Sequence, residues 1–345
     1  MSNTIAPSLK EQYESLKAAN PKLRIRNAAQ ELNVSEAELV ALGIGEGTTL
    51  LNPAFQDILK EIITLGKVMG LTRNNSVVHE RKGIYDNISF EGPVGLAVNK
   101  DIDLRLFMMH WKHAFAVAEG DRKSIQIFDK SGEATHKIYL TSESDVAAYD
   151  ALVQKFRAED QQATLSFEAY PAAAAELPDA EIDVDSFRQG WKNLKDSHEF
   201  FGLTRTHKLT RTQALRLAPA EFVQKVPNDA ARRVLDMASE RQVPVMVFVG
   251  NRGCIQIHSG TVTKVMEAGP WYNVLDPMFN LHLNETDIAS SFIVKKPSTD
   301  GIVTALEVFD QNGEMIVQFF GERKPGIPEL ETWRALVNDL PVVQD

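Results

Sequence analysis

A single cysteine, Cys254, is present in the 345 residues of the sequence. Disulfide frameworks and thiolate metal sites need several cysteines, so both are excluded, and we expect Cys254 to be a packed strand residue. No segment approaches the roughly 18 consecutive apolar residues that span a membrane. The first residues also lack the basic and apolar regions of a signal peptide. We therefore predict a cytoplasmic protein that is not embedded in a membrane.

Basic residues are in the minority, and the formal net charge is −10. No stable nucleic-acid complex is expected, because domains that bind nucleic acid usually carry a basic surplus. Four motifs of common enzymes are missing as well: the P-loop, the dinucleotide-binding G-x-G-x-x-G, the zinc-binding H-E-x-x-H and the G-x-S-x-G elbow. The chemistry must therefore be sought in patterns particular to this chain.

The chain contains an internal repeat of long period. Three pairs of segments are similar in the two halves: VMGLTRNN (68–75) and FFGLTRTH (200–207), IFDKSGE (127–133) and VFDQNGE (308–314), AAYDALVQKF (147–156) and ETWRALVNDL (331–340). A period of this length indicates a duplicated domain rather than a solenoid.

Predicted strands follow one another with short polar turns and no helices between them, at 88–99, 104–119, 243–250, 254–267 and 290–297. This order favours antiparallel sheets. The predicted fold class is α+β, a tandem structural repeat with two large antiparallel sheets that are each flanked by helices. The expected parts are an N-terminal helical segment packed on the first half (1–50), a first repeat (51–170), a linker rich in Ala, Pro and acidic residues (171–185) and a second repeat (186–345).

Residues 24–45 form a predicted pair of short helices, with Ser35 as N-cap and Glu38 completing a capping box. The pair is compatible with a DNA-binding helix-turn-helix or with a small bundle that packs on a sheet. The acidic composition favours the bundle.

One predicted helix carries a histidine in an apolar stripe. The stripe has the spacing of a single helix face and consists of Phe187, Trp191, Leu194, His198 and Phe201. When the two GLTR segments are aligned, His198 falls on Gly66. Such a histidine is either a hydrogen-bonded core residue or a ligand, and its absence from the first half favours the ligand.

Cations gather after this histidine, in a chain that is acidic overall: Arg205, His207, Lys208, Arg211 and Arg216. An imidazole on an apolar face with cations nearby suits a large flat ligand that has a metal centre and acidic edges. Haem has these properties, since imidazole is a common axial ligand and arginine or lysine can pair with the propionates. Haem b as ligand or substrate, with His198 as the axial ligand of its iron, is therefore one interpretation of this pattern, and a hydrogen-bonded core histidine next to a solvated basic face is the other.

Two segments, DSHEFFGLTRTHKLTRTQALRLAP and IDLRLFMMHWKHAFAVAE, together with the duplicated layout, resemble the HemS/ChuS/PhuS family of cytoplasmic haem-utilisation proteins. The resemblance covers essentially the whole chain. It implies two structural repeats and haem held in the second by His198. On the other side of the haem it implies Arg105, with Phe107 beside it.

The same resemblance implies four further haem contacts. Arg211 and Lys296 fall near positions that contact propionates, and Gln318 and Arg323 fall on a strand that lines the pocket. Asp196 or Glu199 could orient the imidazole of His198, and a backbone carbonyl would serve equally.

Three functions remain open at this point. The first is an enzyme of haem-iron utilisation that degrades haem with an external electron donor, in which Arg105 and His198 are the catalytic residues. The second is a carrier or store that receives haem from an inner-membrane importer and passes it to a separate haem oxygenase. The third is a DNA-binding regulator that uses residues 24–45. The first two need the same pocket, so the sequence does not separate them.

Overall fold

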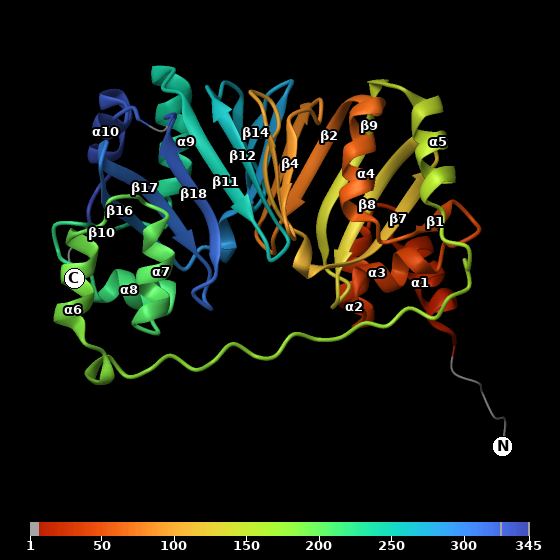
Figure 1. The fold of residues 1–345 in the computed structure, drawn as a ribbon, viewed down its shortest axis with the longest axis horizontal. Coiled ribbons are helices and arrows are strands. Elements are labelled where there is room, and N and C mark those ends of the chain that lie inside the picture. The colour runs from red at the N-terminus through yellow and green to blue at the C-terminus, as the bar shows by residue number, and fades with distance from the viewer. Residues whose placement is uncertain (1–6, 325, 344–345) are drawn as a thin grey trace.

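The protein is described by a computed structural model that covers residues 7–324 and 326–343. Two nine-stranded antiparallel sheets lie side by side, and helices flank both of them (Figure 1). The predicted α+β fold with two large antiparallel sheets is confirmed.

The first sheet has the strand order β1-β7-β8-β9-β2-β3-β15-β14-β13. Its strands are β1 (Thr48–Leu51), β2 (Gly66–Arg73), β3 (Val77–Gly83), β7 (Trp111–Glu119), β8 (Arg122–Asp129), β9 (Ala134–Ser144), β13 (Val265–Ala268), β14 (Trp271–Leu275) and β15 (Phe279–Asn284).

The second sheet has the order β10-β16-β17-β18-β11-β12-β6-β5-β4. Its strands are β4 (Ile88–Glu91), β5 (Val94–Val98), β6 (Asp103–Phe107), β10 (Val223–Val226), β11 (Val245–Gly250), β12 (Cys254–Gly260), β16 (Ser290–Ser298), β17 (Gly301–Phe309) and β18 (Met315–Gly321).

Each sheet is completed by three strands from the other half of the chain. Strands β4–β6 of the first half extend the second sheet beyond β12, and β13–β15 of the second half extend the first sheet beyond β3. The exchange also joins the cores, because Leu104 and Leu106 of β6 are buried among first-half residues. The two halves are therefore interlocked rather than merely adjacent.

Two asparagines fasten the halves together at equivalent turns. Oδ1 of Asn74 accepts from the backbone N–H of Val77, and its amide donates to the carbonyl of Ile316 at 2.8 Å. Asn251 repeats the pattern, since its Oδ1 accepts from the N–H of Cys254 and its amide donates to the carbonyl of Thr135 at 2.9 Å. Each side chain thus satisfies its own turn and a carbonyl in the other half.

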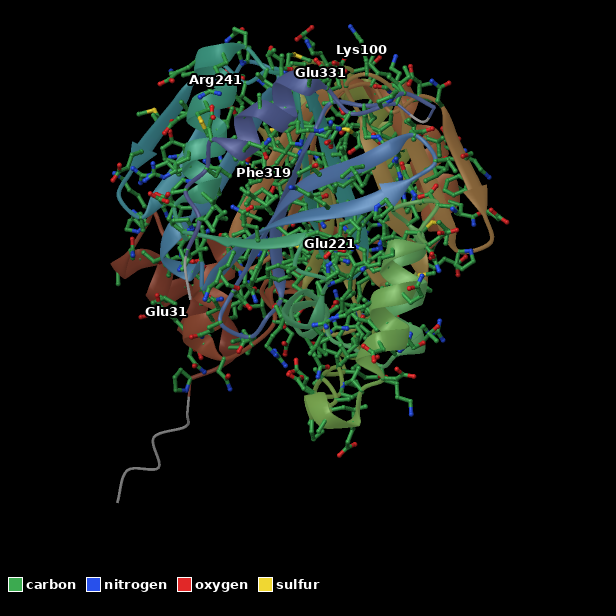
Figure 2. The ribbon with its side chains drawn as sticks, turned by 90° about the vertical axis from the view of Figure 1, so that its left-hand side faces the viewer. Glu31, Lys100, Glu221, Arg241, Phe319 and Glu331 are labelled. Atoms are coloured by element: carbon green, nitrogen blue, oxygen red, sulfur yellow. The ribbon has the colours of Figure 1, made fainter. Side chains whose placement is uncertain are left out.

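Helices cover the face of each sheet that turns toward the other sheet, because they share one core with strands of both sheets. The first sheet is flanked by α4 (Phe55–Ile62) and α5 (Val146–Phe156), and the second by α9 (Ala230–Arg241) and α10 (Glu331–Asn338). Figure 2 shows Arg241 of α9 and Glu331 of α10 near the same end of the molecule, while Phe319 of β18 lies in the interior and is fully buried. Short 3₁₀ turns interrupt the chain at Ile63–Leu65, Met108–His110, Asp179–Glu181 and Glu285–Asp287.

A second group of helices lies below each sheet in Figure 1. These helices are α1 (Leu9–Ala19), α2 (Ile25–Leu32) and α3 (Glu36–Ala41) in the first half, and α6 (Val184–Lys192), α7 (Glu199–Thr206) and α8 (Arg211–Leu217) in the second. The predicted capping box at the start of α3 is confirmed, with Ser35 and Glu38 bonded reciprocally.

An extended segment connects the two groups of helices along the lower edge of the molecule (Figure 1). Residues 163–178 contain no helix or strand. Phe167 packs against the ring of His113, with 4.9 Å between the centroids, and Glu176 pairs with Arg216. The segment is thus attached at both ends.

The repeat is confirmed, but one of its sequence matches is wrong. GLTR lies in strand β2 in the first half and in helix α7 in the second, so Gly66 and His198 are not equivalent. The strand equivalent to β2 is β11, because both occupy the same place in the strand order. The matched turns at 127–133 and 308–314 and the matched helices α5 and α10 do correspond.

Within the described residues, every helix is too short or too polar to cross a membrane. Cys254 is a fully buried strand residue, and burial raises the pKa of its thiol to about 12.

Candidate functional site

His198 is the N-cap residue of α7, and its side chain is 94% exposed. Oδ1 of Asp196 accepts a hydrogen bond from the backbone N–H of His198 at 2.8 Å and another from its Nδ1 at 2.6 Å. These bonds lower the pKa of Asp196, so the carboxylate is ionised and can only accept. Nδ1 therefore carries a proton, and the tautomer in which Nε2 keeps the lone pair is the one that can bind a metal centre.

The single helical stripe predicted for 187–201 is wrong. The chain leaves the helix after Lys192 and re-enters one at Glu199, so Phe187, Trp191 and Leu194 are buried but His198 is not. Phe200 continues the buried side, and Phe201 is 73% exposed. The imidazole is thus presented at the surface together with Phe201 instead of filling a core position.

Arg105 and Phe107 lie on one face of β6, since alternate residues of a strand share a face. The side chain of Arg105 is 36% exposed, and it forms an ion pair with Asp103, two residues earlier on the same face. Its cross-strand partners are Ile255 of β12 and Leu96 of β5. Arg105 thus belongs, by position, to the second sheet.

A row of cross-strand partners crosses this face of the second sheet. From β6 to β16 it consists of Asp103, Ile257, Phe248, Gln318, Glu307 and Phe292. Helices α6–α8 pack on the β16–β17 side of the face, through Val294 and Phe309. Over β18, β11 and β12 the face presents half-buried apolar side chains, and the rings of Phe248 and Phe320 lie 5.0 Å apart.

Arg211 and Lys296 meet at one buried carboxylate. Glu307 accepts from Nε of Arg211 at 2.9 Å and from Nζ of Lys296 at 2.9 Å. Burial acts to raise the pKa of Glu307, but the two cations hold it at about 2. Burial and the charge of Arg211 lower the pKa of Lys296 to about 8, although Glu307 acts in the opposite direction. The cluster of two cations and one anion keeps a single net positive charge.

Arg323 follows strand β18 and pairs with Asp300, with 3.4 Å between Nη2 and Oδ2. Its positive charge also helps to lower the pKa of Asp196, the residue that orients His198. Nε of Arg323 is buried and has no hydrogen-bond partner within the described residues. The guanidinium therefore contributes a positive charge near Asp196, while its Nε faces the protein interior.

Arg105, Phe107 and Gln318 thus lie on one face of the second sheet. Helix α7, which begins after His198, belongs to the helical group that packs on the β16–β17 side of this face. Cations at Arg211, Lys296 and Arg323 lie toward the helical side. This arrangement fits a flat apolar ligand that has a metal centre and acidic edges.

The first half carries the same pair of side-chain types with their places exchanged. His282 of β15 occupies the position in the first sheet that Arg105 occupies in the second. His282 is the cross-strand partner of Val78, four residues after Asn74. Arg105 is the cross-strand partner of Ile255, four residues after Asn251. Arg24 is the N-cap of α2, as His198 is of α7.

The first sheet offers a poorer face for the same kind of ligand. Leu71 and Val78 stand where the second sheet has Phe248 and Ile255. Burial lowers the pKa of His282, and the charge of Glu80 acts against this shift, which places a carboxylate near the ring. The pattern explains why matching letters between the halves misplaced His198.

Sequence reasoning missed three residues of the face: Asp103, Phe248 and Glu307. Asp103 could have been found, because a residue two positions before Arg105 on a strand must share its face. Glu307 carries a weaker signal as the one acidic residue in the apolar run IVTALEVF. Nothing in the sequence marks Phe248 as a site residue, because the run VPVMVFVG is apolar throughout and does not show which face of the strand is buried.

Comparisons with known proteins agree on one group of relatives. The model of the haemin-degrading HemS/ChuX domain matches residues 33–156 and again residues 208–340. The haemin transport protein HemS of Yersinia enterocolitica is 37% identical over 335 residues, which are 96% of each chain.

Two solved structures are similar over nearly the whole chain. The crystal structure of holo-PhuS, a haem-binding protein from Pseudomonas aeruginosa, is 47% identical with a TM-score of 0.95, covering 96% of this chain and 98% of that one. The haem-degrading enzyme ChuS of Escherichia coli O157:H7 is 35% identical with a TM-score of 0.89, at the same coverage.

Proposed function

Because the chain belongs to the HemS/ChuX family of haem utilisation, we propose that it binds haem b against the second sheet, with His198 as the axial ligand of the iron. The observation that carries this proposal is the Asp196–His198 pair, which fixes the proton on Nδ1 and leaves Nε2 as the metal-binding atom. Holo-PhuS, described as a haem-binding protein, supports haem as the ligand.

The remaining residues supply what the ligand needs. The half-buried Phe248 and Phe320 offer an apolar surface and keep water from one side of the macrocycle. The net positive charge of the Arg211–Lys296–Glu307 cluster and the positive charge of Arg323 suit the two propionates.

Because Arg105 is on the second side of the haem, this site differs from one in which protein side chains bind the iron on both sides. Arginine stays protonated and does not bind iron, so it leaves a position open on its side while its N–H groups can donate to a bound anion. Haem supplies an iron centre that reacts with oxygen once an external electron donor has reduced it. We propose that the protein degrades haem in this way to release iron, with Arg105 and His198 as the catalytic residues.

A second candidate function is a carrier that passes haem from an importer to a separate oxygenase. The observation in its favour is that each cation of the site already has a carboxylate: Asp103 for Arg105, Glu307 for Arg211 and Lys296, and Asp300 for Arg323. Internal ion pairs reduce the net attraction for propionates and thereby favour release.

Haem titration of variants tests the axial ligand. His198→Ala should shift the Soret maximum and weaken haem binding by at least about tenfold, the order expected for one lost ligand contact. Two matched controls should keep the parent spectrum: His207→Ala, at the other end of α7, and His282→Ala, in the equivalent face of the first sheet. A parent-like spectrum in His198→Ala would contradict the assignment. The exception is a double variant, His198→Ala/His207→Ala, that loses this spectrum, because His207 would then have replaced His198 as the ligand.

A further inference from the structure

We propose that Asp103 is a positioning residue that holds Arg105 at the sheet side of the haem. The inference rests on the proposed function, since it concerns the residue that faces the open position of the iron. Both side chains project from the same face of β6, and they form an ion pair. Asp103 is 16% exposed and Arg105 is 36% exposed, so the carboxylate is the more buried partner of the pair.

The ion pair uses one edge of the guanidinium and leaves the other. Nη1 of Arg105 donates to Oδ1 of Asp103 and, at 3.3 Å, to the carbonyl of Leu104. Within residues 7–324 and 326–343, no hydrogen bond engages Nε or Nη2 of Arg105. A guanidinium has five N–H donors in a planar fork, so anchoring Nη1 fixes the direction in which the others point.

The surroundings strengthen this anchor. Asp103 is the cross-strand partner of Ile257 and Val98, and Arg105 is the partner of Ile255 and Leu96. On the β12 side the pair is flanked by Ile255 and the buried Ile257, whereas Leu96 and Val98 on the β5 side are exposed. The apolar border on the β12 side lowers the local dielectric constant, so the ion pair is stronger than one surrounded by water.

Asp103 and Arg105 of β6 therefore have different roles. Asp103 holds a flexible side chain that would otherwise sample many rotamers, and Arg105 offers its free N–H groups to an anion on the iron. Without the carboxylate, Arg105 keeps its charge but loses its fixed direction. The loss should therefore appear in anion binding on the sheet side and not in the attachment of haem to His198.

Azide affinity of the ferric haem complex measures this role. Arg105→Ala should weaken azide binding by about tenfold or more, as expected for one lost charged hydrogen bond. Asp103→Ala should weaken it by about fivefold, because the donor remains but is no longer held. Asp103→Asn keeps an acceptor oxygen and should stay within about twofold of the parent. The Soret maximum without azide should be the same in the parent and in the two Asp103 variants.

A second measurement needs no haem. Phenylglyoxal modifies accessible arginines, and mass spectrometry reports its rate at Arg105 in the ligand-free protein. We expect faster modification in Asp103→Ala than in the parent, and a parent-like rate in Asp103→Asn. The rate at Arg233, which pairs with Asp229 on α9, serves as an internal reference.

Three outcomes would overturn the proposal. The first is a parent-like azide affinity in Asp103→Ala while Arg105→Ala weakens binding. The second is an unchanged phenylglyoxal rate in Asp103→Ala, which applies even if no variant binds haem. The third is an Arg105→Ala complex with parent-like azide affinity, in which case Asp103 has nothing to position. That result leaves haem binding through His198 standing, whereas loss of haem binding from the parent would refute the proposed function itself.

Discussion

Arg105 and Ile255 are direct cross-strand partners, although one belongs to the first half of the chain and the other to the second. Their pairing places Arg105 on the face of the second sheet on which helices α6–α8 pack. The same strand turns Leu104 and Leu106 into the core of the first half. Strand β6 therefore serves two purposes at once, and the candidate site depends on a segment that its own half does not contain.

A fragment of residues 171–345 should fail to form the complete site. It lacks β4–β6, so β12 becomes an exposed edge that has lost its partner strand, which favours aggregation. We expect weaker haem binding and an altered Soret band, measured on the monomer fraction from size-exclusion chromatography.

A fusion that restores strands β4–β6 provides the control. Residues 86–108 joined to the fragment through a flexible linker should recover part of the haem affinity, and the same fusion carrying Arg105→Ala should recover less. A monomeric fragment with the affinity and spectrum of the full chain would contradict the prediction.

Much of the fold follows from local patterns. The turns Asp129–Glu133 and Asp310–Glu314 and the closing helices α5 and α10 are repeated in letters and in structure, because each is determined by its own residues. GLTR shows the limit of such matching, since this tetrapeptide is a strand in β2 and a helix in α7. Packing decides such cases, and propensity does not. The exchange of strands β4–β6 and β13–β15 could not be predicted either, because no local sequence pattern shows which of the two sheets a group of strands joins.

The candidate site was predictable in its residue types more than in its geometry. Periodicity placed His198 in a core, but the run Lys195–Asp196–Ser197 carries residues that end and restart helices, and this signal was available. The pairing of Arg211 with Glu307 across two elements had no local signal. Tertiary contacts of this kind are absent from any one-dimensional pattern.

Glu307→Gln should destabilise the fold and also weaken haem binding. The substitution leaves Arg211 and Lys296 without their buried counter-ion, and the cost should be about 3 kcal/mol of unfolding free energy, since Lys296 can lose its proton. Urea denaturation followed by circular dichroism measures the change.

Glu36→Gln is the matched control, because Glu36 pairs with Arg73 and Lys137 in the first half and is equally buried. It should destabilise by a similar amount and leave haem affinity unchanged. Equal loss of haem affinity in both variants would show that the effect of Glu307 is only structural.

Haem affinity should fall as the pH rises through about 8. The pKa of Lys296 is lowered to about 8 in the ligand-free protein, and a propionate beside the amine would raise it in the complex. A group whose pKa is higher in the bound state favours binding below the free pKa and loses this contribution above it, by at most about tenfold per pH unit. Titrations between pH 7 and pH 10 test the slope.

Lys296→Arg removes the titration but keeps the charge, so its affinity should fall less than that of the parent across the same range. Any slope that remains in the variant is due to hydroxide on the iron and not to Lys296. A parent profile with the same slope as that of Lys296→Arg would contradict the role of this amine.

Turnover distinguishes degradation from transport. The purified haem complex, supplied with a reductant and oxygen, should lose its Soret band and release iron to a chelator. Catalase must be present, because free peroxide bleaches haem without any enzyme. Arg105→Ala should slow this loss by about tenfold or more, the value of one charged hydrogen bond in the reaction, while changing haem affinity by less. Arg105→Lys keeps the charge but loses the planar fork, so its rate should lie between those of the parent and Arg105→Ala.

If catalase abolishes all loss of the Soret band, and Arg105→Ala bleaches as fast as the parent when catalase is left out, the protein carries haem and does not degrade it. The ion pairs of Asp103, Asp300 and Glu307 would then be the features that permit release.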